Sequence, residues 1–265
     1  RRIGRNPHRD PNLTDGEFSD TPQNSTILGA AKFSGKTKDG WSIGVLESVT
    51  ANEFAKIKQT DGGIREEIVE PLTNYFIVRA QKDFNERNSY LGGIFTATNR
   101  NLDGDFSELH RSAYTGGIDF RHTWRERDFY LEGNAIMSHV KGSKEAIENT
   151  QRSITRLFQR PDADYVNVDP TRTSLTGSGG RIEAGKQGGG NWRYNAGFIW
   201  RSPELELNDV GFLRKTDEMI QFSEILYLWQ TPTQLYRNIE VNLEQSARYD
   251  FGGNLNRSKF EIKGN

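Results

Sequence analysis

Apolar and polar residues alternate with a period of two along most of this chain. Between Tyr114 and Trp124, Ile118 has the parity of these two aromatic residues, whereas Asp119 and Arg121 have the other. After a short polar turn the same alternation resumes. Because successive side chains of a strand point to opposite faces, the pattern predicts a hairpin with one apolar and one polar face.

The same alternation recurs from one end of the chain to the other. It predicts five hairpins and the start of a further strand, about ten or eleven strands in all. Gly, Asn, Asp and Pro, the residues that tight turns favour, are frequent in the short joins. The predicted strands are 27–34, 41–49, 73–84, 89–98, 112–124, 128–140, 174–185, 192–201, 219–229, 236–249 and 259–263.

Short and long connections alternate between these strands. The long ones cover residues 50–72, 99–111, 141–173 and 202–218, and residues 1–25 also read as a loop. Outer-membrane barrels sort their connections in this way, with short periplasmic turns and long outer loops. The pattern therefore predicts an all-β fold, an antiparallel up-and-down transmembrane β-barrel, seen here as a partial barrel.

Aromatic residues flank the short turns on the apolar parity. Trp and Tyr gather at membrane–water interfaces, where barrels carry aromatic girdles. We therefore expect one row of aromatic side chains at a membrane interface. The row comprises Phe33, Trp41, Phe84, Trp124, Phe129 and Trp192.

Charged and amide residues occupy the opposite parity, which would face the barrel lumen. Two interpretations stay open: charge pairs that hold neighbouring strands in register, and a polar conduit that selects solutes. The mixed signs favour the first, since a selective pore would carry one dominant sign. The residues are Asp119, Arg121, Glu132, Asn134, Arg181, Glu183, Arg193, Asn195, Glu240 and Glu244.

Three positions break the alternation. Lys82 and His122 fall on apolar faces close to turns, where a polar tip can reach the interface. Glu224 falls between Phe222 and Leu226, so we expect either a bulge there or a wrong assignment of this strand's faces.

Composition narrows the classes of function. Lys+Arg 35 against Asp+Glu 36 gives a net charge of -1, so no nucleic-acid partner is expected. The mean hydropathy of -0.77 is low, but 15 Phe, 9 Tyr and 5 Trp argue against disorder. Without cysteine the chain has neither disulfides nor thiolate metal sites. No apolar run is long enough for a transmembrane helix.

Candidate chemistry is sparse. None of His8, His110, His122 and His139 has a partner at metal-ligand spacing, so no metal, cofactor or catalytic residue is predicted. The segment 103–105 (Asp-Gly-Asp) is interpreted as a solvated turn rather than a calcium site.

The long connection after Val140 predicts one short helix in an extracellular loop. Ser143 would cap it, and Arg160-Pro161 would end it. A partial apolar stripe would pack over the loop itself, with a plug or a docking site as the alternative. The stripe contains Ile147, Ile154, Leu157 and Phe158.

The glycine runs are interpreted structurally. Gly177–Gly180 would mark a bend or the close approach of a bulky neighbour within a strand, and Gly188–Gly190 would form a turn.

Several long segments resemble one family. They include TILGAAKFSGKTKDGWSIGVLESVTA from Thr26, VEPLTNYFIVRAQKDFNERNSYLGGIFTATNRNL from Val69, FQRPDADYVNVDPTRTSLTG from Phe158 and WRSPELELNDVGFLR from Trp200. Shorter ones are RRIGRNP at Arg1 and AYTGGIDFRHTW at Ala113. The segments resemble the uncharacterised barrel-type domain that follows a carbohydrate-binding family 9-like module in outer-membrane proteins of Gram-negative bacteria.

The resemblance implies a location and a set of partners, but no catalytic residues. Residues 1–265 would be part of one outer-membrane barrel domain, with the N-terminal sandwich module and the remaining strands lying outside it. Partners would be outer-membrane lipid and lipopolysaccharide, other outer-membrane or periplasmic subunits, and glycans through the sandwich module.

Three hypotheses for function follow from these observations. The first is an outer-membrane barrel segment that serves transport or an envelope assembly. The second is a soluble, all-β carbohydrate-binding protein whose aromatic residues gather in a cleft. The third is a hydrolase embedded in a barrel.

Overall fold

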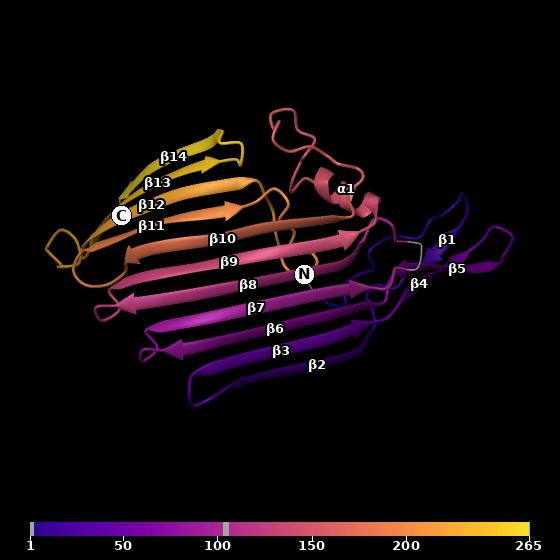
Figure 1. The fold of residues 1–265 in the computed structure, drawn as a ribbon, viewed down its shortest axis with the longest axis horizontal. Helices are drawn as coiled ribbons and strands as arrows, with labels where there is room; N and C mark the ends of the chain where they lie inside the picture. Colours follow the sequence, from indigo (N-terminus) through magenta and orange to yellow (C-terminus); the bar gives the residue numbers. More distant parts are fainter. Residues whose placement is uncertain (1–2, 103–105, 265) are drawn as a thin grey trace.

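The chain forms one long antiparallel sheet, in which Figure 1 shows the strands side by side from β2 to β14. A computed structural model describes residues 3–102 and 106–264. The eleven strands follow the order β14-β13-β12-β11-β10-β9-β8-β7-β6-β3-β2, and all pairs are antiparallel. The predicted all-β, antiparallel up-and-down fold is confirmed. The strands are β2 (Ile27–Lys36), β3 (Trp41–Thr50), β6 (Thr73–Phe84), β7 (Ser89–Arg100), β8 (His110–Trp124), β9 (Phe129–Gly142), β10 (Ser174–Lys186), β11 (Trp192–Arg201), β12 (Glu218–Trp229), β13 (Ile239–Tyr249) and β14 (Leu255–Gly264).

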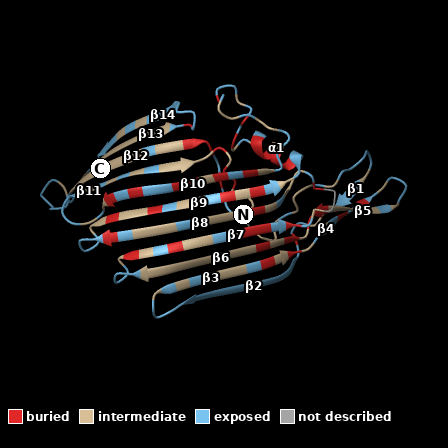
Figure 2. Cartoon of the chain, in the orientation of Figure 1, coloured by how far each residue is buried: buried red, intermediate tan, exposed pale blue. Residues whose placement is uncertain are grey.

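The sheet is open. Over residues 3–102 and 106–264, β2 and β14 each pair on one side, and no closed barrel is found. Figure 2 shows β2 exposed along its whole length, as expected for an edge strand without a covering layer.

A second, three-stranded sheet corrects two loop predictions. Residues 1–25 contain β1 (Phe18–Asp20), and the long connection 50–72 folds into the hairpin β4 (Glu53–Lys58) and β5 (Ile64–Glu70). The strands of this sheet are short, but Ala55 and Ile57 alternate with exposed residues and are fully buried. A short alternating run inside a long connection was the signal that sequence reasoning passed over.

At Glu224 the bulge is wrong and the alternative, a wrong assignment of the faces of β12, is confirmed. The register of β12 with β11 and with β13 is continuous there: Glu224 opposes Asn195 and Glu244. Glu224 therefore lies on the polar face, which β12 also lines with the apolar residues Ile220, Phe222, Leu226 and Leu228. Phe222 among them contacts a neighbouring strand closely. Its ring covers Gly197, where an added Cβ would come within 2.4 Å of the Phe222 ring.

Two hairpin turns share an unusual backbone. Residues 85–87 and 125–127 each have three consecutive positive φ angles without a glycine. Turn residues with positive φ match the right-handed twist of the paired strands, so these residues can connect the two strands of each hairpin in a short turn. The alternation of connection lengths breaks down after β12, because residues 230–238 join β12 to β13 and only 250–254 join β13 to β14.

The predicted helix is present but short. Helix α1 spans Lys144–Arg152, and Ser143 Oγ accepts a hydrogen bond from the Ala146 amide at 3.0 Å, as predicted for its cap. Ile147 packs on Ala113, Val140 and Leu175 of the sheet. The helix ends before the apolar stripe is complete; Phe158 is buried, whereas Ile154 and Leu157 are exposed. No helix in the described part of the chain is long and apolar enough to cross a membrane.

The segment 202–217 lies against one face of the sheet near α1. A Cβ on Gly177 would sit 2.2 Å from the Leu205 amide nitrogen, so only glycine permits this contact. On the opposite face a Cβ on Gly180 would clash with the Trp200 ring at 2.2 Å. The interpretation of these glycines as sites of close approach is confirmed.

Candidate functional site

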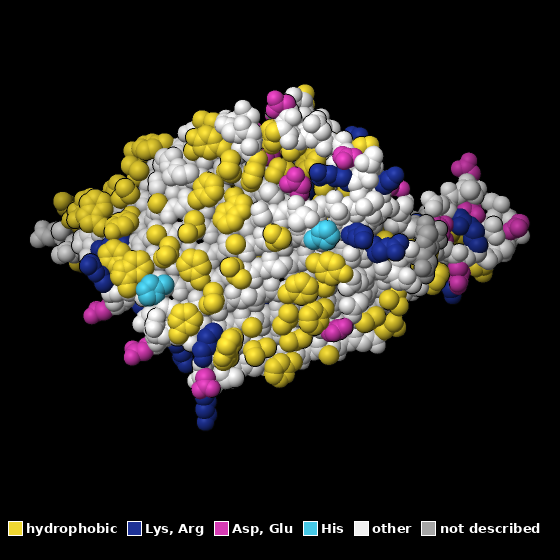
Figure 3. Space-filling model, in the orientation of Figure 1, with side chains coloured by type: hydrophobic (Ala, Val, Ile, Leu, Met, Phe, Trp, Pro, Cys, Tyr) yellow, Lys and Arg dark blue, Asp and Glu magenta, His cyan; other side chains and the backbone are white. Residues whose placement is uncertain are grey.

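The sheet has one face on which apolar side chains stay exposed, here called the apolar face. It carries Ile118 and Met137, whose side chains are 61% and 60% exposed, and the register places Phe95 and Ile182 on the same side. Figure 3 shows hydrophobic side chains spread across this face, with charged ones mainly near its margins. Nothing among the described residues covers this apolar band.

The register places all six predicted interface aromatics on the apolar face. Trp124 stacks on Phe129 with ring centroids 5.8 Å apart, and Trp192 meets Tyr227 edge-on at 4.6 Å. Sequence reasoning missed Tyr227 and Trp229 because it assigned the faces of β12 to the wrong parity. With Trp41, Phe84 and Phe33 on the neighbouring strands, these rings form a row here called the turn belt.

Cations accompany the turn belt. Lys82 Nζ lies 5.6 Å from the centre of the Trp41 ring, and Arg125 lies 5.6 Å from that of Phe129. His122 stacks on Trp124 at 5.6 Å. Lys82, Arg125 and His122 each rest on an aromatic ring at the edge of the apolar face, which accounts for the breaks in alternation at Lys82 and His122.

A second aromatic row, which the sequence did not reveal, lies at the other end of the same face. Phe76, Tyr114 and Trp200 lie near the ends of β6, β8 and β11 that adjoin the long connections, and Tyr249 lies at the same edge of the sheet, beside the short join 250–254. We call it the loop belt. It was missed because the sequence was searched for aromatic residues beside the predicted short turns, at the other end of the strands.

The opposite face, here called the polar face, is crossed by ion pairs. Arg79 pairs with Asp119 at 2.7 Å, and Arg121 pairs with Glu132 at 2.6 Å. The first pair joins β6 to β8 across β7, and the second joins the neighbouring strands β8 and β9. The pairs are partly solvent-exposed, so each contributes only about 0–1 kcal/mol and chiefly fixes the register.

This series of polar contacts, here called the polar ladder, continues from β10 to β14. Arg181 pairs with Glu183, which also accepts a hydrogen bond from the Tyr130 hydroxyl. Glu224 accepts from Asn195 at 3.0 Å and from Asn242 at 2.8 Å. At the edge strand, Glu244 pairs with Lys259 at 3.2 Å and Lys263 at 2.9 Å.

Not every predicted polar residue joins this ladder. Arg193 donates to the Gly190 carbonyl at 2.8 Å and so braces its own turn. Within the described ranges, the side chains of Asn134 and Glu240 make no hydrogen bond or ion pair, although the register places both on the polar face. The residues that sequence reasoning missed are Arg79, Glu224, Asn242, Lys259 and Lys263, and their parity in well-formed strands was the available signal.

Buried ion pairs fasten the segment 202–217 to the loop end of the polar face. Asp209 accepts from Arg100 at 2.7 Å and lies 3.0 Å from His110 Nδ1. His110 Nε2 lies 2.7 Å from Thr150 Oγ1, and that hydroxyl donates to the Ala146 carbonyl at 2.8 Å. The order acid–imidazole–hydroxyl resembles a nucleophilic triad, but the hydroxyl's single proton already points at the helix backbone. The arrangement therefore holds the segment 202–217 against the sheet and α1 and does not activate a nucleophile.

This fastening should weaken in acid. Burial would raise the pKa of Asp209, but the His110 hydrogen bond and the Arg100 charge outweigh it and lower that pKa. The stabilisation is therefore complete above the unfolded pKa of about 3.9 and is lost as the pH falls below that value. We expect amide exchange in 205–213, corrected for intrinsic rates, to accelerate from pH 5 to pH 3. Asp209→Asn should remove this pH dependence. If exchange in the variant accelerates in acid as much as in the parent protein, the assignment is contradicted.

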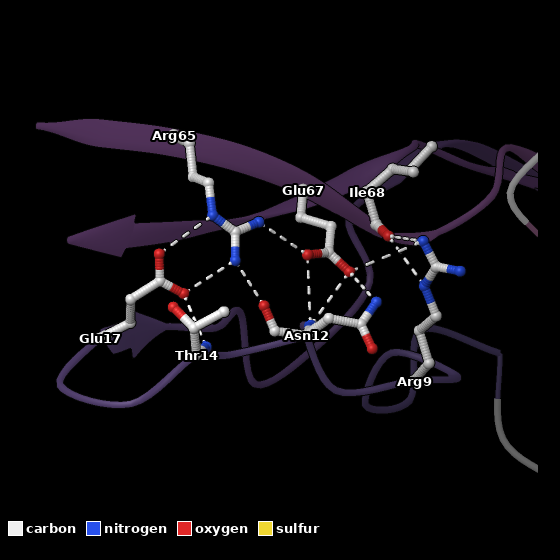
Figure 4. A network of polar contacts seen from close by, with 7 residues as sticks. All are labelled: Arg9, Asn12, Thr14, Glu17, Arg65, Glu67 and Ile68. Atoms are coloured by element: carbon white, nitrogen blue, oxygen red, sulfur yellow. Dashed lines mark hydrogen bonds and ion pairs between the residues drawn. The ribbon is translucent and has the colours of Figure 1, made fainter. Parts of the chain in front are cut away.

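The three-stranded sheet is held by a separate network, drawn in Figure 4. Arg65 bridges Glu17 and Glu67, both at 3.0 Å, and Glu67 also accepts from the Asn12 side chain at 2.9 Å. The hydrogen bond from Arg65 lowers the pKa of Glu17 to about 2. Arg9 donates to the Ile68 carbonyl at 2.9 Å, so this network ties residues 9–17 to β5.

Fold and site together define an all-β protein built on an open antiparallel sheet with one apolar and one ion-paired face. The chain belongs to the family described as Domain of unknown function (DUF5916), whose model matches residues 1–264. No curated protein matches it. The resemblance to an uncharacterised domain is therefore confirmed, while the outer-membrane setting and the neighbouring sugar-binding module stay predictions.

Proposed function

We propose that the eleven-stranded sheet is part of the wall of a β-barrel in the outer membrane, with its apolar face on lipid and its polar face toward the lumen. The observation that carries the proposal is an exposed apolar band bracketed by two aromatic belts. Trp192 and Trp200 stand at the two ends of β11, and at about 3.3 Å per residue roughly 26 Å of strand separates them. Barrels that span the outer membrane show an apolar band about 25 Å tall between aromatic girdles, and strand tilt shortens the projected distance somewhat.

The polar face supports a structural part in an envelope assembly more than charge-selective transport. Its charges pair with opposite charges on the same or nearby strands, so little net sign is left to select a solute. The free edges of β2 and β14 would need further strands or another subunit, because unpaired backbone groups are costly in lipid. Transport of a small neutral solute remains compatible with the proposal.

A soluble carbohydrate-binding protein is the rival hypothesis. Sugar rings stack on aromatic side chains inside a cleft, whereas the rings of the two belts are spread along the margins of an exposed face. Extended exposed apolar surface is also rare in soluble monomers and marks an interaction with a membrane or a partner. The hydrolase hypothesis has its best geometry at Asp209, His110 and Thr150, where the hydroxyl proton is already engaged.

Depth-dependent fluorescence quenching tests the proposal. Variants that keep a single tryptophan, Trp124 or Trp192, should be quenched more by lipids brominated near the headgroup than by lipids brominated near the chain end. A matched variant whose single tryptophan replaces Ile118, at mid-height of the apolar face, should show the reverse order. Quenching by iodide in water, with no response to brominated lipid at any of the three positions, would overturn the proposal.

A further inference from the structure

A groove of about 830 Å³ opens on the apolar face at the loop end of β8 and β9. Tyr114 and His139 form part of its floor, and the exposed side chains of Arg111 and Lys141 line its rim. Figure 3 shows cationic side chains beside a histidine near this end of the face. The groove therefore lies where the apolar band meets the polar loops.

A break in the register aims Arg111 into this groove. His110 opposes Gly142, whereas Ser112 opposes Lys141, so Arg111 is an extra residue in β8. Such a bulge re-aims side chains. It lets His110 stay on the polar face with Asp209, while Arg111 joins Ser112 and Lys141 on the apolar face.

The two cations differ from three arginines on the polar face. Among the described residues, neither Arg111 nor Lys141 takes part in an ion pair, whereas Arg79, Arg121 and Arg181 each contact a carboxylate. The acidic residue of the adjoining helix turn, Glu145, is engaged by the Ser107 hydroxyl. Two positive charges that have no ion-pair partner in 3–102 or 106–264 therefore stand above an aromatic and apolar floor.

We propose that this groove binds the phosphorylated sugar headgroup of lipopolysaccharide, with the acyl chains lying along the apolar face. The inference rests on the proposed function, which places this end of the sheet at the outer leaflet. Arg111 and Lys141 would pair with a phosphate, since guanidinium and ammonium groups both bind phosphate through charge-assisted hydrogen bonds. Tyr114 and His139 would contact the sugar and its amide groups, and the acyl chains would continue over Phe95 and Met137.

Lipid retention in nanodiscs tests the site. The protein is placed in phosphatidylcholine nanodiscs that contain a small fraction of bisphosphorylated lipid A, and retained lipid A is quantified by native mass spectrometry. Arg111→Gln/Lys141→Gln should lower retention about 10- to 30-fold, because each basic residue near an anionic headgroup contributes about 1 kcal/mol. The matched control, Lys82→Gln/Arg125→Gln, removes the same charge from the turn belt of the same face and should retain lipid A as the parent protein does.

Four outcomes distinguish the sources of binding. Weaker retention of monophosphoryl lipid A by the parent protein, with no competition from millimolar inorganic phosphate, would support a lipid headgroup site. Full competition by inorganic phosphate would overturn it in favour of a simple anion site. Equal retention by both double variants, in protein that enters nanodiscs normally, would overturn this inference alone, whereas failure of every form to enter nanodiscs would overturn the proposed function as well.

Discussion

Replacing Ile118 with arginine is expected to destabilise the protein folded in a bilayer by about 2–4 kcal/mol, the cost measured for a cation at mid-height on the lipid side of a barrel. Ile118 projects from the apolar face of β8, is 61% exposed, and lies between the Tyr114 and Trp124 positions of the two belts. In lipid the guanidinium would have to reach an interface or draw water into the bilayer. The measurement is reversible urea unfolding in the presence of phosphocholine vesicles.

The expected loss discriminates between lipid and water beside this face. If Ile118 faced water, an exposed substitution of this kind would change stability by no more than about 0.5 kcal/mol. Asn134→Arg is the matched control, because Asn134 is also exposed but projects from the polar face of the neighbouring strand. A similar small effect for both variants would contradict the assignment of the apolar face to lipid.

Arg156→Met should produce the second large effect, a loss of about 3–5 kcal/mol in the stability of the segment 202–217. The Arg156 side chain is 1% exposed, and its guanidinium lies 2.7 Å from Glu206. Glu206 is itself buried, and its amide donates to Ser138 Oγ at 2.9 Å. Removing the arginine leaves a carboxylate buried without its counter-charge. The segment cannot relieve this by leaving the sheet, because that would expose Leu205.

Hydrogen exchange of the amides of Leu205 and Leu213 measures this loss locally, even if global unfolding changes little. Arg156→Met/Glu206→Met should recover much of the stability, because replacing both charges by apolar groups of similar volume removes the unpaired charge. Arg172→Met serves as the control: Arg172 pairs with Asp169 at 3.8 Å, and both side chains are about half exposed. Its loss should cost no more than about 1 kcal/mol. A double variant as unstable as Arg156→Met would show that packing, and not charge, holds the segment.

The alternation of apolar and polar residues was enough to predict, for most strands, which residues share a face and where the tight turns fall. Alternation is a local property of an extended backbone, so Ile118 and Asp119 could be assigned to opposite faces without knowledge of their neighbours. The cap at Ser143 was equally local, since its hydroxyl reaches an amide three residues away. Where strands were short or the apolar parity was mixed, as at Ala55 and Phe222, the same reasoning failed because local preference was weak there.

Contacts between residues of different strands depend on how the strands are placed in space. Arg79 and Asp119 lie forty positions apart and pair across two strand boundaries, so their contact depends on the register of every strand between them. The bulge at Arg111 depends in the same way on what His110 must reach on the other face. The segment 202–217 covers the polar face because Gly177 leaves room for Leu205, a contact between distant parts of the chain. Side-chain direction follows from the backbone of each strand alone, whereas charge pairing, coverage and open edges follow from how strands are placed beside one another.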